Sequence, residues 1–284
     1  MPQGGTILSA FALSSFPGIT SSLVIWLLSG GALILHHPFD AEVLEQQINE
    51  QPCDVLVAPA PLALRLAEAG MLSRMPALRH VIGLWRAPEQ VASSPEWPAG
   101  QAALTDVYLF GEVGLLAACR TDDGAPNPIL PGPQRAPRDA EDASITGEIL
   151  LTPKGTLALR GPMIPVAAYA PAVPAGNSLT AQPSLDHIDT GYAARLDRAT
   201  GALCITGPPS GIMAVGGYRF LAHDLQEWAK RLGQGALLTA LPDRLSGHRL
   251  AGRAQDNARA REAFSELGLN PLMVEAFRDR ATTG

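Results

Sequence analysis

The first part of the chain alternates between wholly apolar segments of strand length and segments whose apolar residues recur at helical spacing. The apolar segments are 31–37, 53–59 and 78–85. Between them, residues 41–50 and 61–70 place apolar side chains three and four positions apart, which predicts amphipathic helices. Apolar strands that are separated by helices are typical of a parallel sheet covered on both faces. The pattern therefore predicts an α/β sheet over residues 1–120.

The predicted helices begin and end at recognisable residues. Asp40 precedes the first helix and offers a side-chain cap to its free N–H groups. Pro61 stands in the first turn of the second helix, and Gly70 follows its last residues. Beyond the third apolar segment, residues 104–119 predict one or two further strands.

Residues 1–39 contain no charged side chain, and 19–35 is apolar enough to be considered as a membrane span. A Pro-Gly pair at 17–18 and a Gly-Gly pair at 30–31 divide this part into pieces shorter than the ~20 apolar residues that a span requires. No basic segment precedes it, as one would in a signal peptide. We therefore expect a buried helix followed by a strand, and no membrane span.

The pattern changes after residue 120. Residues 121–142 are rich in Pro, Gly and Asp and predict a loop. Short strand-like runs separated by Gly and Pro follow in 143–206, which is typical of antiparallel hairpins or a small barrel. Residues 223–233 and 254–267 then predict two amphipathic helices.

The predicted fold class is thus α/β: a parallel sheet layered with helices, followed by a small β-rich, barrel-like segment and a small C-terminal α+β lobe. We expect residues 1–206 to form one core domain and 207–284 to form the lobe, with a hinge near 205–212. Pro208 and Pro209 fix φ at two successive residues of that hinge, which predicts a single orientation of the lobe.

The composition excludes one class of partner. A formal net charge of −6 and a pI of about 5.5 argue against an electrostatic grip on nucleic acid. The three cysteines stand far apart in apolar runs without metal-ligand spacing, which predicts small buried side chains in a reducing compartment. We therefore expect a cytoplasmic protein that binds no nucleic acid.

Three short motifs carry candidate chemistry. Asp186, His187 and Asp189 could bind a metal, but no further ligand pair repeats their spacing, and polar turn residues are the favoured interpretation. Residues 152–156, Thr-Pro-Lys-Gly-Thr, look like part of a phosphate-binding loop, yet no helix follows, and a hairpin turn is favoured. The His pair at 36–37 ends a predicted parallel strand, where ligands gather in open α/β sheets.

Five segments stand in an order that resembles one known family. They are 9–66, 107–114, 147–169, 189–192 and 207–226. Val-Tyr-Leu-Phe-Gly-Glu-Val-Gly at 107–114 falls where the family has Tyr-Gly-x-Thr-Glu-x-Gly, and Asp-Thr-Gly-Tyr at 189–192 falls on its Arg-Thr-Gly-Asp. The family is the AMP-forming adenylate superfamily, which includes acyl-CoA synthetases and the adenylation domains of peptide synthetases. The resemblance extends over nearly the whole chain.

This resemblance implies a nucleotide site. The residues that it places there are Tyr108, Asp189, Thr190, Gly191, Tyr192 and Gly217. Tyr108 is the implied wall for adenine, Glu112 is the implied carboxylate for Mg²⁺, and Asp189 or Tyr192 is implied to lie near the sugar. The implied cofactors are ATP or AMP, Mg²⁺ and CoA, and the implied substrate is a small carboxylate or acyl group.

The sequence also departs from the family's pattern. Where the family has an Asp that bonds both ribose hydroxyls, this chain has Tyr192, whose ring fills the volume of a ribose. Pro208 stands in place of an Arg, no lysine follows Lys230, and the family's phosphate-binding loop has no counterpart. Losing one donor to the transition-state charge raises a barrier by about 3 kcal/mol. We therefore expect a pseudoenzyme that retains at most a nucleotide, acyl or CoA binding role.

Two other interpretations stay open. One is a working carboxylate–CoA or carrier-protein ligase, ATP-dependent and AMP-forming, that is completed by a separate N-terminal polypeptide. The other is a truncated reading of a longer gene. The uncharged apolar start favours a missing upstream portion, because such a surface normally packs on other protein. Tyr192 and Pro208 favour degeneracy, because truncation alone does not change interior motifs.

Overall fold

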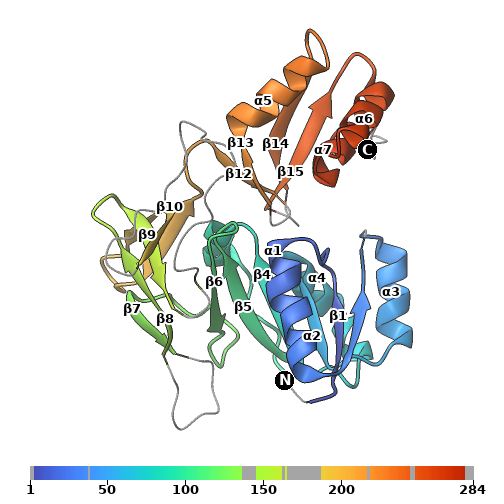
Figure 1. The fold of residues 1–284 in the computed structure, drawn as a ribbon. Coiled ribbons are helices and arrows are strands. Elements are labelled where there is room, and N and C mark those ends of the chain that lie inside the picture. Colours follow the sequence, from blue (N-terminus) through green and yellow to red (C-terminus); the bar gives the residue numbers. More distant parts are fainter. Residues whose placement is uncertain are drawn as a thin grey trace.

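A computed structural model describes most of the chain and shows a layered α/β part, a curved antiparallel sheet and a small C-terminal lobe (Figure 1). The described residues are 3–37, 39–135, 145–161, 164, 187–215, 218–243 and 247–278. The predicted fold class, with its three parts in this order, is confirmed.

The main sheet, sheet A, consists mostly of parallel strands. Its order is β2 (Ala32–Leu35), β1 (Thr6–Ser9), β3 (Val55–Pro59), β4 (His80–Trp85), β5 (Ala103–Leu109) and β6 (Leu115–Cys119). All neighbours are parallel except β5 and β6, which form an antiparallel pair. The three apolar segments therefore form strands as predicted, while β1 is a strand that the pattern did not predict.

Helices cover both faces of sheet A, as predicted. One face carries α1 (Phe16–Gly18), a π-helical segment (Ile19–Leu23) and α2 (Val24–Ser29); the other carries α3 (Ala41–Glu50) and α4 (Ala60–Glu68). Two 3₁₀ segments, Leu72–Arg74 and Pro88–Ser93, lie in the connections. Successive strand residues point to opposite faces: Ile7 packs on the α2 side and Leu8 on the α3–α4 side.

The helix α2 corrects one prediction, because it is not buried. Ile25 and Trp26 pack toward sheet A, but Val24, Leu27 and Leu28 on the outer side are 38%, 64% and 81% exposed. The sequence is apolar on every side of this helix, so its periodicity could not distinguish a buried helix from one with an open face. No helix in the described part of the chain is long and apolar enough to cross a membrane.

A second sheet, sheet B, is antiparallel and curved. Its order is β11 (Leu203–Gly207), β10 (Ile188–Leu196), β9 (Thr156–Arg160), β8 (Ile145–Leu151) and β7 (Gly132–Arg135). The β8–β9 turn, closed by a 2.9 Å bond from Gly155 N–H to the Thr152 carbonyl, confirms the predicted hairpin at 152–156. The predicted loop 121–142 is wrong for β7: Pro133 is tolerated there because β7 is an edge strand.

The C-terminal lobe, residues 212–278 of the described chain, has its own hydrophobic core. It contains β12 (Ile212–Val215), β13 (Tyr218–Leu221), α5 (Ala222–Arg231), β14 (Leu237–Asp243), β15 (Gly247–Arg253), α6 (Asn257–Glu266) and α7 (Pro271–Glu275). Leu225, Phe264 and Phe277 are each at most 1% exposed in this core. The α5 and α6 helices confirm the two predicted amphipathic helices, while the domain boundary at 206–207 and the hinge stay predictions.

Candidate functional site

Tyr108, the implied adenine wall, lies near the end of β5, and Glu112, the implied metal ligand, lies in the turn between β5 and β6. Phe110 N–H donates to the Gly114 carbonyl at 3.0 Å, and Gly111 takes a φ of 59°, which closes the turn. The Glu112 side chain is exposed on this turn, whereas Tyr108 is 2% exposed in the core. The two side chains are therefore in different environments, and their implied roles stay predictions.

The stretch Asp189–Tyr192 lies inside strand β10, where a bulge interrupts the pairing with β9. Asp189 pairs with Ala158 and Ala193 pairs with Thr156, so β10 contains extra residues between these two pairs. Gly191 takes a φ of 72°, a left-handed conformation that suits glycine. The turn expected from the sequence is thus a bulge within a strand.

Internal hydrogen bonds use the polar groups of this bulge. The Asp189 carboxylate accepts from the Gly191 N–H at 2.8 Å and from the Thr156 hydroxyl at 3.0 Å. The buried Thr190 hydroxyl donates to the Leu157 carbonyl at 2.8 Å and accepts from the Tyr192 N–H at 3.1 Å. These bonds hold the bulge in shape, and the implied role of Asp189 and Thr190 in a nucleotide site stays a prediction.

Tyr192 and the β5–β6 turn come together between the two sheets. The Tyr192 ring meets the Phe110 ring edge to face, and Tyr192 is 3% exposed. Phe110 and Tyr108 lie two positions apart near the end of β5, in the same hydrophobic core. The structure thus brings together Tyr108 and Tyr192 of the implied site, but as members of the core.

Gly191 also marks the place where the chain approaches the C-terminal lobe. A Cβ atom at Gly191 would lie 2.9 Å from Cγ of Pro209, so only glycine fits against this proline without a shift.

Gly217 and Asp186 lie outside the described residues. His187 lies 3.4 Å from the Glu148 carboxylate, and the described residues contain no group of three His, Cys, Asp or Glu that could hold a metal.

His36, the first of the two histidines that follow β2, has a structural role. Its ring is 2% exposed and accepts the Asp40 N–H on Nε2 at 3.1 Å, so Nδ1 carries the proton that Gln47 Oε1 accepts at 2.9 Å. The Asp40 carboxylate caps α3 by accepting from the Glu42 and Val43 N–H groups at 2.9 and 3.0 Å. His36 therefore fixes the start of α3.

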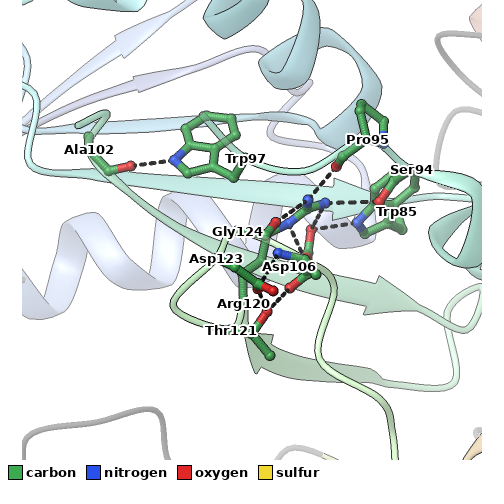
Figure 2. Close-up of polar contacts among 11 residues, drawn as sticks. Trp85, Ser94, Pro95, Trp97, Ala102, Asp106, Arg120, Thr121, Asp123 and Gly124 are labelled. Atoms are coloured by element: carbon green, nitrogen blue, oxygen red, sulfur yellow. Dashed lines mark hydrogen bonds and ion pairs between the residues drawn. The ribbon is translucent and has the colours of Figure 1, made fainter. Parts of the chain in front are cut away.

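The sequence did not predict the buried ion pair between Asp106 and Arg120, which Figure 2 shows. Arg120 Nε donates to Asp106 at 2.9 Å, and the Trp85 ring N–H donates to the same carboxylate at 2.7 Å. The other guanidinium N–H groups donate to the carbonyls of Pro95 and Gly124 and to the Ser94 hydroxyl. The position of Asp106 in the strand could have indicated this ion pair. Asp106 lies on the same face of β5 as Leu104 and Tyr108, which face the core, and a charge on that face needs a partner.

The network changes the chemistry of its neighbours. Burial raises the pKa of Asp106, while the Arg120 charge and the Trp85 and Arg120 hydrogen bonds act against that shift. Burial and the nearby Asp106 charge raise the pKa of Tyr108 well above its usual value, so the phenol stays neutral. These groups support the core under the β5–β6 turn.

Comparison of the sequence with protein-family models gave no match, and comparison with curated proteins gave no significant match. The structure nevertheless resembles solved structures. The amide bond synthetase McbA from Marinactinospora thermotolerans superposes with a TM-score of 0.62 at 20% identity, over 96% of this chain and 57% of that one. A malonyl-CoA ligase, solved with methylmalonyl-CoA and AMP bound, gives 0.59 at 16% identity, over 93% and 60%.

A third similar structure is NpsA–ThdA from Klebsiella oxytoca, an artificially fused adenylation–PCP di-domain. It superposes with a TM-score of 0.57 at 15% identity, over 93% of this chain and 52% of that one. This chain therefore has the fold of the AMP-forming adenylate enzymes, and the resemblance found in the sequence is confirmed at the level of the fold. The chain spans only 52% to 60% of the length of these three proteins.

Proposed function

We propose that this protein is a catalytically impaired relative of the acyl-CoA synthetases that keeps a binding role toward a nucleotide, an acyl group or CoA. The observation that supports this proposal is the position of Tyr192. It stands where the resemblance implies a ribose-binding carboxylate, and its ring is 3% exposed against Phe110. A phenol offers a ribose no pair of anionic acceptors, and its ring takes up volume that a bound ribose would use, so any remaining nucleotide binding is weakened at this position.

The neighbouring polar groups support the same proposal. Both oxygens of Asp189 already accept hydrogen bonds from the chain itself. Glu112 is exposed and can supply one carboxylate ligand to a magnesium ion. Mg²⁺ in nucleotide sites takes one or two carboxylates, and its remaining ligands are phosphate and water. Adenylation needs several fixed donors around the reacting phosphate, and each lost donor costs about 3 kcal/mol of barrier.

The shared fold supports the choice of ligands. The malonyl-CoA ligase of the same fold holds AMP and a CoA ester, so these two ligands are the first candidates for a remaining binding role here. A partly degenerate site keeps affinity more easily than turnover, because binding does not require the groups that act only in the transition state.

The test combines exchange and binding. ATP–pyrophosphate exchange with a panel of carboxylic acids is expected to stay at the level of the acid-free blank. Calorimetry with Mg–ATP, AMP and CoA is expected to show saturable binding of at least one ligand. Glu112→Gln should weaken any Mg²⁺-dependent part, and Glu68→Gln, an exposed Glu on α4, is the matched control. Exchange above the blank would refute the impairment, and no binding of any ligand would refute the binding role.

A second candidate is a working ligase completed by a separate N-terminal polypeptide. The exposed outer face of α2 favours it, because a helix that is apolar on all sides is normally buried. On this candidate, Val24, Leu27 and Leu28 pack against the missing polypeptide.

Co-expression with the product of the adjoining upstream reading frame tests the second candidate. A stable complex with acid-dependent exchange would support it. The double variant Leu27→Gln/Leu28→Gln should then lose both complex and exchange, while the isolated chain keeps its stability within about 0.5 kcal/mol because both side chains are exposed. Exchange that stays at the blank with the co-expressed product would reject this candidate.

A further inference from the structure

The two faces of sheet A are covered unequally. Six strands make a sheet about 24 Å wide, and a helix with its side chains is about 10–12 Å across, so each face has room for two helices side by side. In the described part of the chain, one face carries α3 and α4, whereas the other carries a single helical stretch, 16–29, which contains α1 and α2. Figure 1 shows this stretch in front of the sheet. The α2 face therefore has room for one more helix.

The margin of the α2 face, formed by β4 and β6, is incompletely covered. Ile82 of β4 and Leu115 and Ala117 of β6 pack against the core of this face, yet all three are only partly buried. Between the last two, Leu116 points to the opposite face and is 8% exposed. The same strand is thus well covered on the α4 side and poorly covered on the α2 side.

The outer side of α2 is a second open part of this face. Val24, Leu27 and Leu28 are 38%, 64% and 81% exposed, while Ile25 and Trp26 pack toward the sheet. Covering apolar surface of this kind is favourable by about 25 cal/mol per Å². The α2 face thus presents a helix without a cover beside a sheet margin without a helix.

The charge of this face indicates which partner it fits. Residues 1–39 contain no charged side chain, and Ile82, Leu115 and Ala117 carry none either, although the whole chain has a formal net charge of −6. A strongly acidic or basic partner finds no opposite charge on these side chains, and a second copy of the chain meets no like charge on them. The acidic side chains of α3 belong to the other face of the sheet.

We propose that a second copy of this chain covers the α2 face, in a dimer with two-fold symmetry. The α2 helix of each copy lies on the β4–β6 margin of the other, and the two α2 helices meet through Leu27 and Leu28. A helix that is apolar on all sides suits this place, between a sheet and another helix. One contact, repeated by the symmetry, covers both open parts of the face and closes on itself.

This inference does not depend on the proposed catalytic impairment, because it rests on the α2 face and not on the implied nucleotide residues. The second candidate function puts a separate polypeptide on the same side chains of α2. A second copy and a separate polypeptide cannot cover this face at the same time, so the assembly of the purified chain distinguishes them.

Sedimentation equilibrium of the full chain measures its assembly. A mass of twice the 29.8 kDa of one chain is expected. Leu28→Glu should raise the dissociation constant about tenfold or more, because it sets like charges against each other across the two-fold axis. Leu267→Glu is the matched control, because Leu267 follows α6 in the C-terminal lobe and is 58% exposed; this variant should dimerise as the unmodified chain does. Both leucines are exposed, so both variants should keep their circular dichroism spectra.

Cross-linking tests the geometry of the dimer. Leu28→Cys, treated with a short bis-maleimide, should give a covalent dimer in higher yield than Leu267→Cys or the unmodified chain with its own cysteines. The proposal is overturned if the unmodified chain sediments as a monomer, if Leu28→Glu leaves the dissociation constant unchanged, or if Leu28→Cys cross-links no better than Leu267→Cys. A chain that is monomeric alone and forms a complex only with the co-expressed upstream product would assign the face to a separate polypeptide. Neither result alters the expected level of ATP–pyrophosphate exchange by the chain alone.

Discussion

The Tyr192 ring on β10 meets the Phe110 ring at the end of β5 edge to face, with centroids 5.3 Å apart and planes at 84°. This pair connects sheet B to the β5–β6 turn of sheet A. Edge-to-face pairs contribute about 0.5–1.5 kcal/mol beyond the burial of their surfaces. Tyr192 therefore stabilises the packing of one sheet on the other, whatever its role toward a ligand.

Truncation of Tyr192 is expected to destabilise the fold. Tyr192→Ala should lower the free energy of unfolding by about 3–5 kcal/mol, the range for removing a buried aromatic ring, whereas Tyr192→Phe should cost about 1 kcal/mol. Tyr192→Asp should unfold the chain rather than create a ribose site, because it buries an unpaired carboxylate. Urea denaturation measures all three. A Tyr192→Ala protein as stable as the unmodified chain would show that the ring is not part of the core.

The Asp106–Arg120 pair gives a second stability prediction. Arg120→Gln should cost about 3–5 kcal/mol, because it leaves the buried Asp106 charge without its partner. Arg74→Gln is the matched control: its ion pair with Glu45 is about half exposed and should contribute less than about 1 kcal/mol. Chemical denaturation of both variants gives the comparison. Equal costs for the two would contradict a special role for burial.

Most strands of sheet A could be predicted because they are apolar without interruption. The strand β1 was not predicted, because it is four residues long and ends at Ser9, a polar residue in a buried position. The Ser9 hydroxyl is satisfied by the Ser22 hydroxyl at 2.7 Å, a contact between segments that a local pattern does not contain. The strand β7 was not predicted for a similar reason, because its pairing with β8 overrides the turn preference of Gly132 and Pro133.

The sequence predicted which motifs stand near the candidate site, but not whether their side chains are buried or exposed. Motif order located Tyr108 and Tyr192, but the burial of both rings depends on how sheet B packs against sheet A. Asp106 could have been identified from its alternation with Leu104 and Tyr108 in β5. The contact of Arg86 with the Phe11 ring could not be predicted, because β1, which precedes Phe11, was not predicted as a strand.

His80 gives a prediction about pH. Its ring bonds the Thr105 hydroxyl at 2.9 Å, and burial lowers its pKa below the usual 6.5. Below pH 6.5 the unfolded chain binds a proton that the folded chain does not, so stability is full above 6.5 and falls as pH drops toward the folded pKa. His80→Gln should flatten this fall below about pH 6.5, where a difference of one bound proton between the folded and unfolded chains changes the free energy of unfolding by at most about 1.4 kcal/mol per pH unit.

The control for His80 is His223→Gln, because the His223 side chain is 80% exposed. Unfolding free energies are measured in urea at half-unit steps of pH for both variants and for the unmodified chain. The slope should change in His80→Gln alone. An unchanged slope in His80→Gln would mean that His80 is protonated equally in the folded and unfolded chains.

Gly191 and Gly201 form a pair that separates backbone strain from packing. Their φ angles are 72° and 71°, but a Cβ atom at Gly191 would lie 2.9 Å from Pro209, and one at Gly201 would meet nothing within 4 Å. Gly201→Ala should cost about 1 kcal/mol, the left-handed penalty alone. Gly191→Ala should cost about 1–3 kcal/mol more, the usual range for overpacking, because the proline ring must shift. Thermal and urea denaturation of both variants measure the difference. Equal costs would mean that residues around Pro209 move freely, and that the chain entering the C-terminal lobe is not held against the β10 bulge.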